Sequence, residues 1–283
     1  MKAIIYGEVI WDVYPDEAVI GGAPFNFSAH LAHLGNEAHL ITAIGNDTLG
    51  EDALKEMQKH GIHTNLVQKN EFQTGKCLVT LDGNGIPSYN VLTNTAYDNI
   101  ELAEDTAKDL ECDVFYFNTL IQRNPVSKNT LKNILANNTF PEVFCDINLR
   151  KNCYDKESAD LCLKTSTMVK ISDEEGPFLE EMGLIAKGEE HFAKRVSAAY
   201  PNLKQIIYTL GKEGSEVYDK ATQTLTSSGR PPEVEVVSTV GAGDCFGATY
   251  LSSIMQGETI AEAIKKATLR SNIVVANKEA IPF

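Results

Sequence analysis

The alternation of short apolar strands with amphipathic helices is the feature that most constrains the fold of this chain. Strand-like runs at 2–6, 38–44 and 114–117 are separated by segments in which apolar residues recur with helical spacing. Strands joined through helices run parallel, and helices then cover both faces of the sheet. The pattern predicts a doubly wound α/β fold with a mostly parallel sheet. It also predicts strands at 143–147, 168–171, 205–209 and within 215–226, and helices at 24–34, 50–60, 127–136, after Asp155, at 243–255 and at 260–277.

Two segments, 12–20 and 74–95, break this alternation with residues typical of strands. The turn sequence Asp82-Gly83-Asn84-Gly85 divides the second segment into two strands. Neither segment is long enough to fold alone, so we expect one small sheet that projects from the main body as a lid. Without a linker or repeat, the chain is expected to form a single domain over 1–283 with this excursion.

Composition narrows the possible partners. An apolar content of 43% in 283 residues is enough for a sizeable core. With 39 acidic and 25 basic residues the net charge is −14, which disfavours nucleic acids and anionic membranes and favours a small-molecule partner. The N-terminus enters the first strand without a signal-peptide or membrane-spanning pattern, so a cytoplasmic location is expected. The six scattered cysteines are expected to be reduced thiols.

The sequence Gly241-Ala242-Gly243-Asp244 indicates where chemistry takes place. Small residues leave the backbone N–H groups open to an anion, and the apolar spacing that follows predicts a helix starting at this turn. Free N–H groups and the positive end of the helix dipole can hold a phosphoryl group. A carboxylate in the first turn can accept the proton of an attacking hydroxyl. Taken alone, these residues also fit a simple helix cap.

Two other nucleotide motifs do not fit. A dinucleotide-binding fingerprint requires a third glycine where Phe246 stands. A P-loop requires Ser or Thr after its Gly-Lys pair, whereas Gly75-Lys76 is followed by Cys77. Neither motif therefore explains the turn before Asp244.

A second glycine-containing motif, IGGAPFNFSAHLAHLG, lies at 20–35. Its glycines let the backbone approach a ligand, and Asn26 can donate and accept hydrogen bonds toward sugar hydroxyls. Together with VSTVGAGDCF at 237–246, it resembles the paired signatures of the ribokinase/PfkB family of carbohydrate kinases. Asp12 and the runs CDINLR at 145–150, VKISDEE at 169–175 and YTLGKEGS at 208–215 follow in the order of that family. The resemblance covers essentially the whole chain.

This resemblance implies a ribokinase-like fold, ATP as phosphoryl donor, Mg²⁺ as cofactor and a sugar or nucleoside alcohol as acceptor. By motif match, Asp244 would be the catalytic base, and Gly241, Ala242 and Gly243 the anion hole. Glu175 would hold Mg²⁺ through water, although Asp173-Glu174-Glu175 also fits an acidic first turn of a helix. The sugar residues would be Asp12, Gly22 and Asn26, and the nucleotide residues Lys170, Ser172, Glu175, Thr209, Gly211 and Gly214.

Three positions depart from the family pattern. The family usually has Asp where Ser238 stands and Asn where Ser172 stands, and relatives commonly continue beyond Phe283. Many relatives build a monovalent-cation site from the loop around 238 and the C-terminal segment, so a potassium requirement stays open. Ser172 still offers a hydroxyl to a phosphate or a water.

The acceptor is predicted from FNTLIQRNPVS at 117–127 and NTAYDNI at 94–100, which are similar to bacterial fructokinase-like members. This similarity places Arg123 near the sugar; the other interpretation is an arginine that caps a strand or pairs on the surface. The lid segments carry only Lys76 as a cation, and a phosphorylated sugar would need more. We expect a neutral hexose, fructose first. Kinases for ketodeoxygluconate, ribose or a nucleoside, and a catalytically silent sugar-binding module, are the alternatives.

The lid also suggests an assembly. Its second segment has apolar residues on a hairpin too small to bury them alone, namely Leu78, Leu81, Ile86, Tyr89 and Val91. We expect a homodimer that packs lid against lid, with a hairpin folded onto its own body as the alternative.

Overall fold

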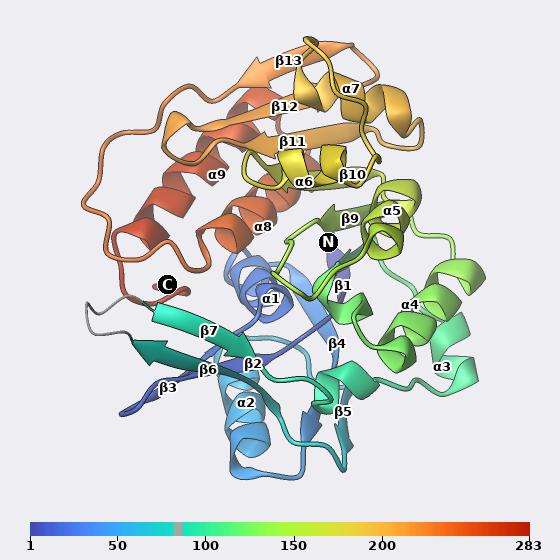
Figure 1. Ribbon diagram of the computed structural model, residues 1–283, viewed down its shortest axis with the longest axis vertical. Helices are drawn as coiled ribbons and strands as arrows, with labels where there is room; N and C mark the ends of the chain where they lie inside the picture. Colours follow the sequence, from blue (N-terminus) through green and yellow to red (C-terminus); the bar gives the residue numbers. More distant parts are fainter. Residues whose placement is uncertain (82–86) are drawn as a thin grey trace.

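The computed structural model describes residues 1–81 and 87–283, and within them nine strands form the main sheet (Figure 1). Their order is β13-β12-β11-β10-β9-β8-β1-β4-β5. Neighbours from β5 to β11 pair parallel, whereas β12 and β13 add an antiparallel edge. The predicted doubly wound, mostly parallel α/β fold is confirmed. The strands are β1 (Lys2–Tyr6), β4 (Glu37–Gly45), β5 (Val67–Asn70), β8 (Val114–Asn118), β9 (Glu142–Asp146), β10 (Met168–Ser172), β11 (Gln205–Thr209), β12 (Ser215–Asp219) and β13 (Thr224–Ser227).

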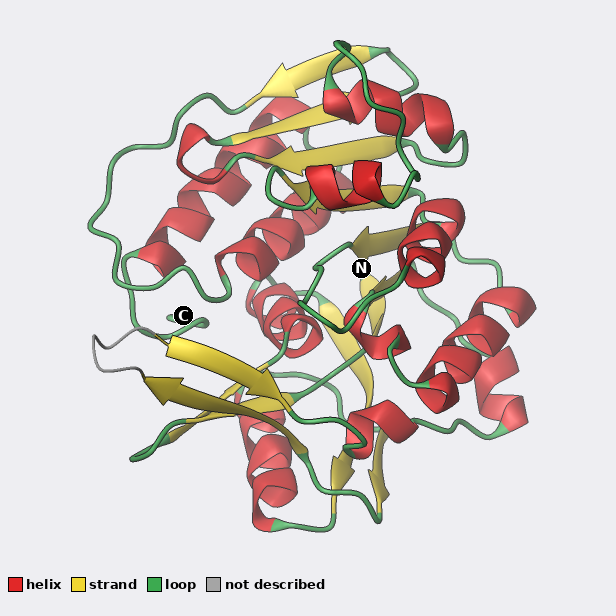
Figure 2. Ribbon diagram, in the orientation of Figure 1, coloured by secondary structure: helices red, strands yellow, loops and turns green. Residues whose placement is uncertain are grey.

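Helices cover both faces of this sheet (Figure 2), and each face has its own apolar cluster. One layer contains α1 (Ala23–His33), α2 (Thr48–Lys59), α8 (Ala242–Met255) and α9 (Ile260–Val275). The other contains α3 (Glu104–Lys108), α4 (Pro125–Asn137), α5 (Lys156–Thr165), α6 (Gly176–Glu181) and α7 (Phe192–Ala199). Short 3₁₀ segments are η1 (Ala96–Asn99), η2 (Leu120–Gln122) and η3 (Gly211–Glu213). No helix within the described residues combines the length and apolarity needed to cross a membrane.

Two helices begin two residues earlier than predicted because a side chain caps each of them. Asp47 accepts a hydrogen bond from the N–H of Gly50 at 2.9 Å, so α2 starts at Thr48. Asn124 accepts from the N–H of Val126 at 2.9 Å and is followed by Pro125, which favours the first position of α4. Capping therefore placed these boundaries where apolar periodicity alone did not.

A second sheet of four described strands projects from the main body at the lower left of Figure 1. Its order is β3 (Ala18–Gly21), β2 (Ile10–Val13), β6 (Gly75–Leu81) and β7 (Pro87–Val91), with β2 and β6 parallel and the other pairs antiparallel. Trp11 is buried and donates from Nε1 to the Leu49 carbonyl of α2 at 3.0 Å, which fastens this small sheet to the body. The predicted small sheet is confirmed. The turn at 82–85 and Ile86 lie outside the described residues, and the single domain over 1–283 stays a prediction.

Candidate active site

The predicted anion-binding turn lies at the start of α8, with Asp244 in its first turn. Gly241 caps the helix with a φ of 78°, a conformation that favours glycine. A Cβ on Gly241 would lie 2.6 Å from the Cβ of Ala280, and one on Gly243 would lie 3.2 Å from Nζ of Lys170. These close contacts with Ala280 and Lys170 account for glycine at positions 241 and 243.

The C-terminal segment braces this turn. Ala280 packs on Gly241, and its carbonyl accepts a hydrogen bond from Nε2 of the buried His30 at 3.0 Å. Ile281 is buried, and the guanidinium of Arg270 lies 3.6 Å from the ring centroid of Phe283. These contacts hold the last residues against both α1 and α8.

Asn26 of α1 and Asp244 of α8 meet directly. The Asn26 amide donates from Nδ2 to Oδ2 of Asp244 at 2.9 Å. Its Oδ1 is buried and has no hydrogen-bond partner within the described residues. A buried acceptor without a partner is costly, so a ligand hydroxyl that donates to it would be favoured.

The environment of Asp244 makes its carboxylate more basic than usual. Part of the residue is exposed, but its carboxyl is largely desolvated. Burial, followed by the negative charge of Asp146, raises the pKa of Asp244 to about 6; Asn26, Lys170 and Arg150 oppose a larger rise. The carboxylate is mostly ionised at neutral pH and more basic than an ordinary aspartate.

Lys170 and Asp146 form a buried ion pair beneath the turn. Nζ of Lys170 donates to Oδ2 of Asp146 at 2.7 Å. Burial would lower the pKa of Lys170, but Asp146 and Glu175 raise it above its ordinary value, so the ammonium stays charged. Because Lys170 also lies next to Gly243, its charge is available to an anion bound at the turn.

Glu175 joins the loops that follow β9 and β10. Its two oxygens accept from the N–H groups of Leu149 and Ser172, each at 2.8 Å. Burial and the nearby Asp146 raise the pKa of Glu175. Oδ1 of Asp146 is buried without a hydrogen-bond partner in the described part of the chain. This unpaired oxygen beside a second carboxylate suits a hydrated Mg²⁺, which takes oxygen ligands, so the residues present fit the predicted cofactor.

A cavity of about 530 Å³ lies beside the turn formed by 241–243. It brings together five predicted residues, namely Ser172, Thr209, Gly211, Ala242 and Gly243. Gly214 is not among the lining residues: its φ is 99°, and a Cβ there would lie 2.1 Å from the Gly229 carbonyl oxygen. Close packing thus accounts for glycine at 214, and its contact with a nucleotide stays a prediction.

Three of the predicted sugar residues come from the small sheet and from the start of α1. Asp12 belongs to β2 of the small sheet, and Gly22 caps α1 with a φ of 104°. A Cβ on Gly22 would lie 2.8 Å from the Glu8 carbonyl oxygen, so only glycine lets these backbones approach. Burial raises the pKa of Asp12, while a hydrogen bond from Cys77 and the charge of Arg150 oppose the rise.

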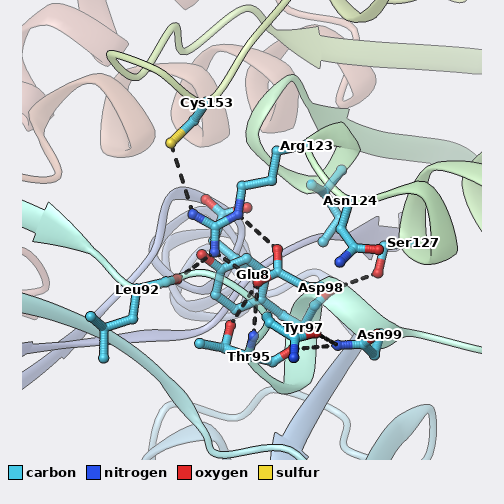
Figure 3. A network of polar contacts seen from close by, with 12 residues as sticks. Glu8, Leu92, Thr95, Tyr97, Asp98, Asn99, Arg123, Asn124, Ser127 and Cys153 are labelled. Carbon is cyan, nitrogen blue, oxygen red and sulfur yellow. Dashed lines mark hydrogen bonds and ion pairs between the residues drawn. The ribbon is translucent and has the colours of Figure 1, made fainter.

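Arg123 is held by a buried network (Figure 3). Its Nε and Nη2 donate to the two oxygens of Asp98 at 2.7 and 2.8 Å, and Nη2 also donates to the Leu92 carbonyl at 2.6 Å. The guanidinium lies 5.0 Å from the Tyr97 ring centroid. Because Leu92 follows β7, Arg123 fixes the point where the small sheet rejoins the body. Arg123 therefore forms an ion pair, as one of the two interpretations expected, but the pair with Asp98 is buried rather than on the surface. Contact between Arg123 and a sugar stays a prediction.

Two charged residues without a predicted role, Glu8 and Arg150, also interact electrostatically with Asp244. Glu8 is 1% exposed, and both its oxygens accept from Nδ2 of Asn118 at 3.0 Å. Burial raises the pKa of Glu8 to about 7 despite these bonds. Burial likewise raises the pKa of Asp12 and Asp244, and in all three cases the charge of Arg150 opposes the rise. The positive charge of the exposed Arg150 therefore acts on all three carboxyls.

The position of Glu8 at the end of a strand is a signal that could have identified it. Asn118, Asp146 and the already predicted Ser172 likewise end or closely follow a strand of the main sheet. The carboxyl ends of parallel strands meet at one edge, where ligands bind in open α/β sheets.

Comparison with known proteins agrees with this geometry. An uncharacterized sugar kinase of Pyrococcus horikoshii is 29% identical over 246 residues, which cover 83% of this chain and 73% of its own. Fructokinase-2 of Oryza sativa subsp. japonica is 24% identical over 309 residues, covering 99% and 89%. The fold is similar to that of fructokinase from Vibrio cholerae O395 in its fructose, ADP and calcium ion bound form, with a TM-score of 0.84 at 20% identity, covering 100% and 95% of the chains.

The family assignment covers almost the entire chain. The sequence pattern described as pfkB family carbohydrate kinase matches residues 3–283. The turn before Asp244, this carboxylate and the residues that line the cavity all lie within this match. The chain therefore belongs to the PfkB family of carbohydrate kinases, and it is a phosphotransferase.

Proposed function

We propose that this kinase transfers the γ-phosphoryl group of ATP to a hydroxyl of a neutral sugar, with fructose as the first candidate. The observation that carries the proposal is the position of Asp244. Its carboxylate accepts a hydrogen bond from Asn26 on one side and lies beside the open backbone of 241–243 on the other. A sugar hydroxyl and a terminal phosphate can therefore meet at one base.

In the proposed reaction, the sugar hydroxyl loses its proton to Asp244 as its oxygen bonds to the γ-phosphorus. The bond from that phosphorus to the β-bridging oxygen breaks, and ADP leaves. The N–H groups of Gly241 and Gly243 and the ammonium of Lys170, which lies next to Gly243, stabilise the charge on the transferred group. The N–H of Ala242 donates to the Thr239 carbonyl at 3.3 Å and would have to exchange this bond for one to the phosphate. Asn26 keeps the carboxylate oriented toward the acceptor.

The nucleotide would occupy the cavity of about 530 Å³ lined by Ser172, Thr209 and Gly211. Its volume is in the range of small-molecule sites. Asp146 and Glu175 would hold Mg²⁺ through water, and this ion would supply positive charge to the phosphate oxygens. The ADP and calcium ion bound to the Vibrio cholerae fructokinase support this assignment. A monovalent-cation requirement stays open.

Charge balance favours a neutral acceptor. The positive charge of Arg150 acts on three carboxyls, those of Glu8, Asp12 and Asp244, so negative groups outnumber this cation. Arg123 is already neutralised by both oxygens of Asp98. An anionic acceptor such as ketodeoxygluconate or a sugar phosphate would be repelled by these carboxylates. The fructokinases among the relatives make fructose the first choice.

We also propose that two copies associate through their small sheets. Leu78 of β6 is 38% exposed, although it lies on a short strand that has an apolar pattern. Burial of this face against a second copy would exclude water from the sugar site. The cytoplasmic location stays a prediction.

A coupled assay of ADP release tests the function, with fructose, ribose, glucose, ketodeoxygluconate and adenosine as acceptors. Fructose should give the highest kcat/KM. Asp244→Asn should lower turnover by about 10²–10⁴ while the affinity for ATP is retained, because only the base is lost. Asp155→Asn, which changes the cap of α5 away from the site, is the matched control.

Near-normal turnover of Asp244→Asn would refute Asp244 as the base. Preference for another acceptor would leave the kinase assignment intact and replace fructose. Sugar binding without ADP release from any acceptor would identify the silent binding module instead.

A further inference from the structure

A second cluster of polar side chains lies far along β4 from the phosphate-binding edge. Glu37 and His39 lie at the amino end of β4, whereas the active site gathers at the carboxyl ends of the parallel strands. His63 lies beside them, after α2. One potential ligand atom from each of the three residues lies within 4.8 Å of those from the other two.

Backbone pairing fixes the two histidines side by side. The N–H of His63 donates to the Ala38 carbonyl at 2.8 Å, and the N–H of Leu40 donates to the His63 carbonyl at 3.3 Å. This isolated parallel bridge stacks the imidazoles of His39 and His63, with centroids 4.3 Å apart and planes at 11°. Glu37 lies two residues before His39 on the same strand, so both side chains lie on the same face.

Asn65 orients the half-buried imidazole of His39. Its carbonyl oxygen can only accept, so Nδ1 of His39 donates to Oδ1 of Asn65 at 3.0 Å. The proton is thereby placed on Nδ1, and Nε2 is left with a free lone pair. Nε2 is buried and has no hydrogen-bond partner in residues 1–81 or 87–283. A histidine whose other nitrogen is held by a polar partner is the usual arrangement of a metal ligand.

A second histidine pair shows the contrast. Nδ1 of His60 and Nε2 of His33 lie 3.2 Å apart and hydrogen-bond to each other. The facing nitrogens of this pair are therefore already occupied. His33 and His60 provide a matched control with the same residue types.

We propose that Glu37, His39 and His63 bind a divalent transition-metal ion, such as Zn²⁺, at a site separate from the kinase centre. Two imidazoles and one carboxylate are a common zinc ligand set that leaves a position for water. Because the two rings are stacked with planes at 11°, the exposed ring of His63 has to turn for both lone pairs to reach one ion. Nitrogen ligands favour Zn²⁺, Co²⁺ or Ni²⁺ over Mg²⁺. A bound ion would join the segment after α2 to β4.

Calorimetric titration of metal-free enzyme with Zn²⁺, in buffer that contains excess Mg²⁺, tests this site. We expect one ion per chain. His63→Ala should weaken binding by more than about 100-fold, because it removes a direct ligand rather than an outer partner worth about 10–100-fold. Glu37→Gln should weaken it by at least about 10-fold. His60→Ala should bind as the unchanged chain does.

Titration with Co²⁺ separates this site from binding by cysteine. Nitrogen and oxygen ligands give visible cobalt bands without the near-ultraviolet band of a thiolate ligand. Melting curves without metal establish that each variant is folded, and added Zn²⁺ should raise the Tm of the unchanged chain and of His60→Ala only. Unchanged affinity in His63→Ala, equal loss in His60→Ala, or a thiolate band would each overturn the proposal.

Discussion

The pH dependence of phosphoryl transfer should report the environment of Asp244. Burial and Asp146 raise the pKa of this carboxyl to about 6, and only its ionised form can accept the proton of the sugar. The ionised fraction is about 91% at about pH 7 and about 9% at about pH 5, so kcat/KM for the sugar should fall about tenfold over that interval. An aspartate with a pKa of about 3.9 would lose less than about 10% over the same range.

The measurement is kcat/KM for the sugar at saturating ATP and Mg²⁺, with circular dichroism at each pH to establish that the fold persists. Glu8 also titrates nearby, with a pKa of about 7, so Glu8→Gln is the control. This variant should keep the loss of activity near pH 6, because the titrating base is still Asp244. A midpoint below about pH 5 in the unchanged enzyme, or disappearance of the acid limb in Glu8→Gln, would refute this reasoning.

Three further predictions concern the contact of Asn26 with the sugar, the ion pair between Arg123 and Asp98, and the dimer. Asn26→Ala should raise the KM for the sugar far more than that for ATP, because it leaves sugar hydroxyls unpaired; equal changes in both KM values would exclude a sugar contact. Arg123→Met should lower the free energy of unfolding in urea by about 3–5 kcal/mol, because Asp98 becomes an unpaired buried charge; a loss below about 1 kcal/mol would contradict this. Light scattering at micromolar concentration should show a dimer, and a fully active monomer would rule out association through the small sheet.

Most strands and helices of the main body were predictable because apolar periodicity distinguishes them. The short elements β5, α3, α6 and α7 were not predicted. The roles of Asp244 and Asn26 came from motifs, and the structure brings the two side chains within 2.9 Å although 218 positions separate them. Such proximity depends on how α1 and α8 pack, which periodicity does not encode.

The electrostatic partners were harder to predict. Asp146 and Arg150 belong to the CDINLR run at 145–150, for which the motifs predicted no role. Their effect on the pKa of Asp244 arises because the fold brings the end of β9 close to the start of α8. Arg123 was expected at the sugar, but its geometry also depends on Asp98 in a separate 3₁₀ turn. A charge pair between distant segments leaves no local pattern, so the sequence allowed both interpretations of Arg123.

The contacts of the C-terminal residues with the turn before Asp244 have a practical consequence for handling this enzyme. An affinity tag fused after Phe283 would act on the same few residues that pack Ala280 against Gly241 and bond to His30. A polyhistidine tag at the other end would lie close to Glu37, whose N–H bonds to the Met1 carbonyl at 3.0 Å, and would compete for transition metals there. A tag without histidine at the N-terminus therefore leaves both the turn and the metal titration undisturbed.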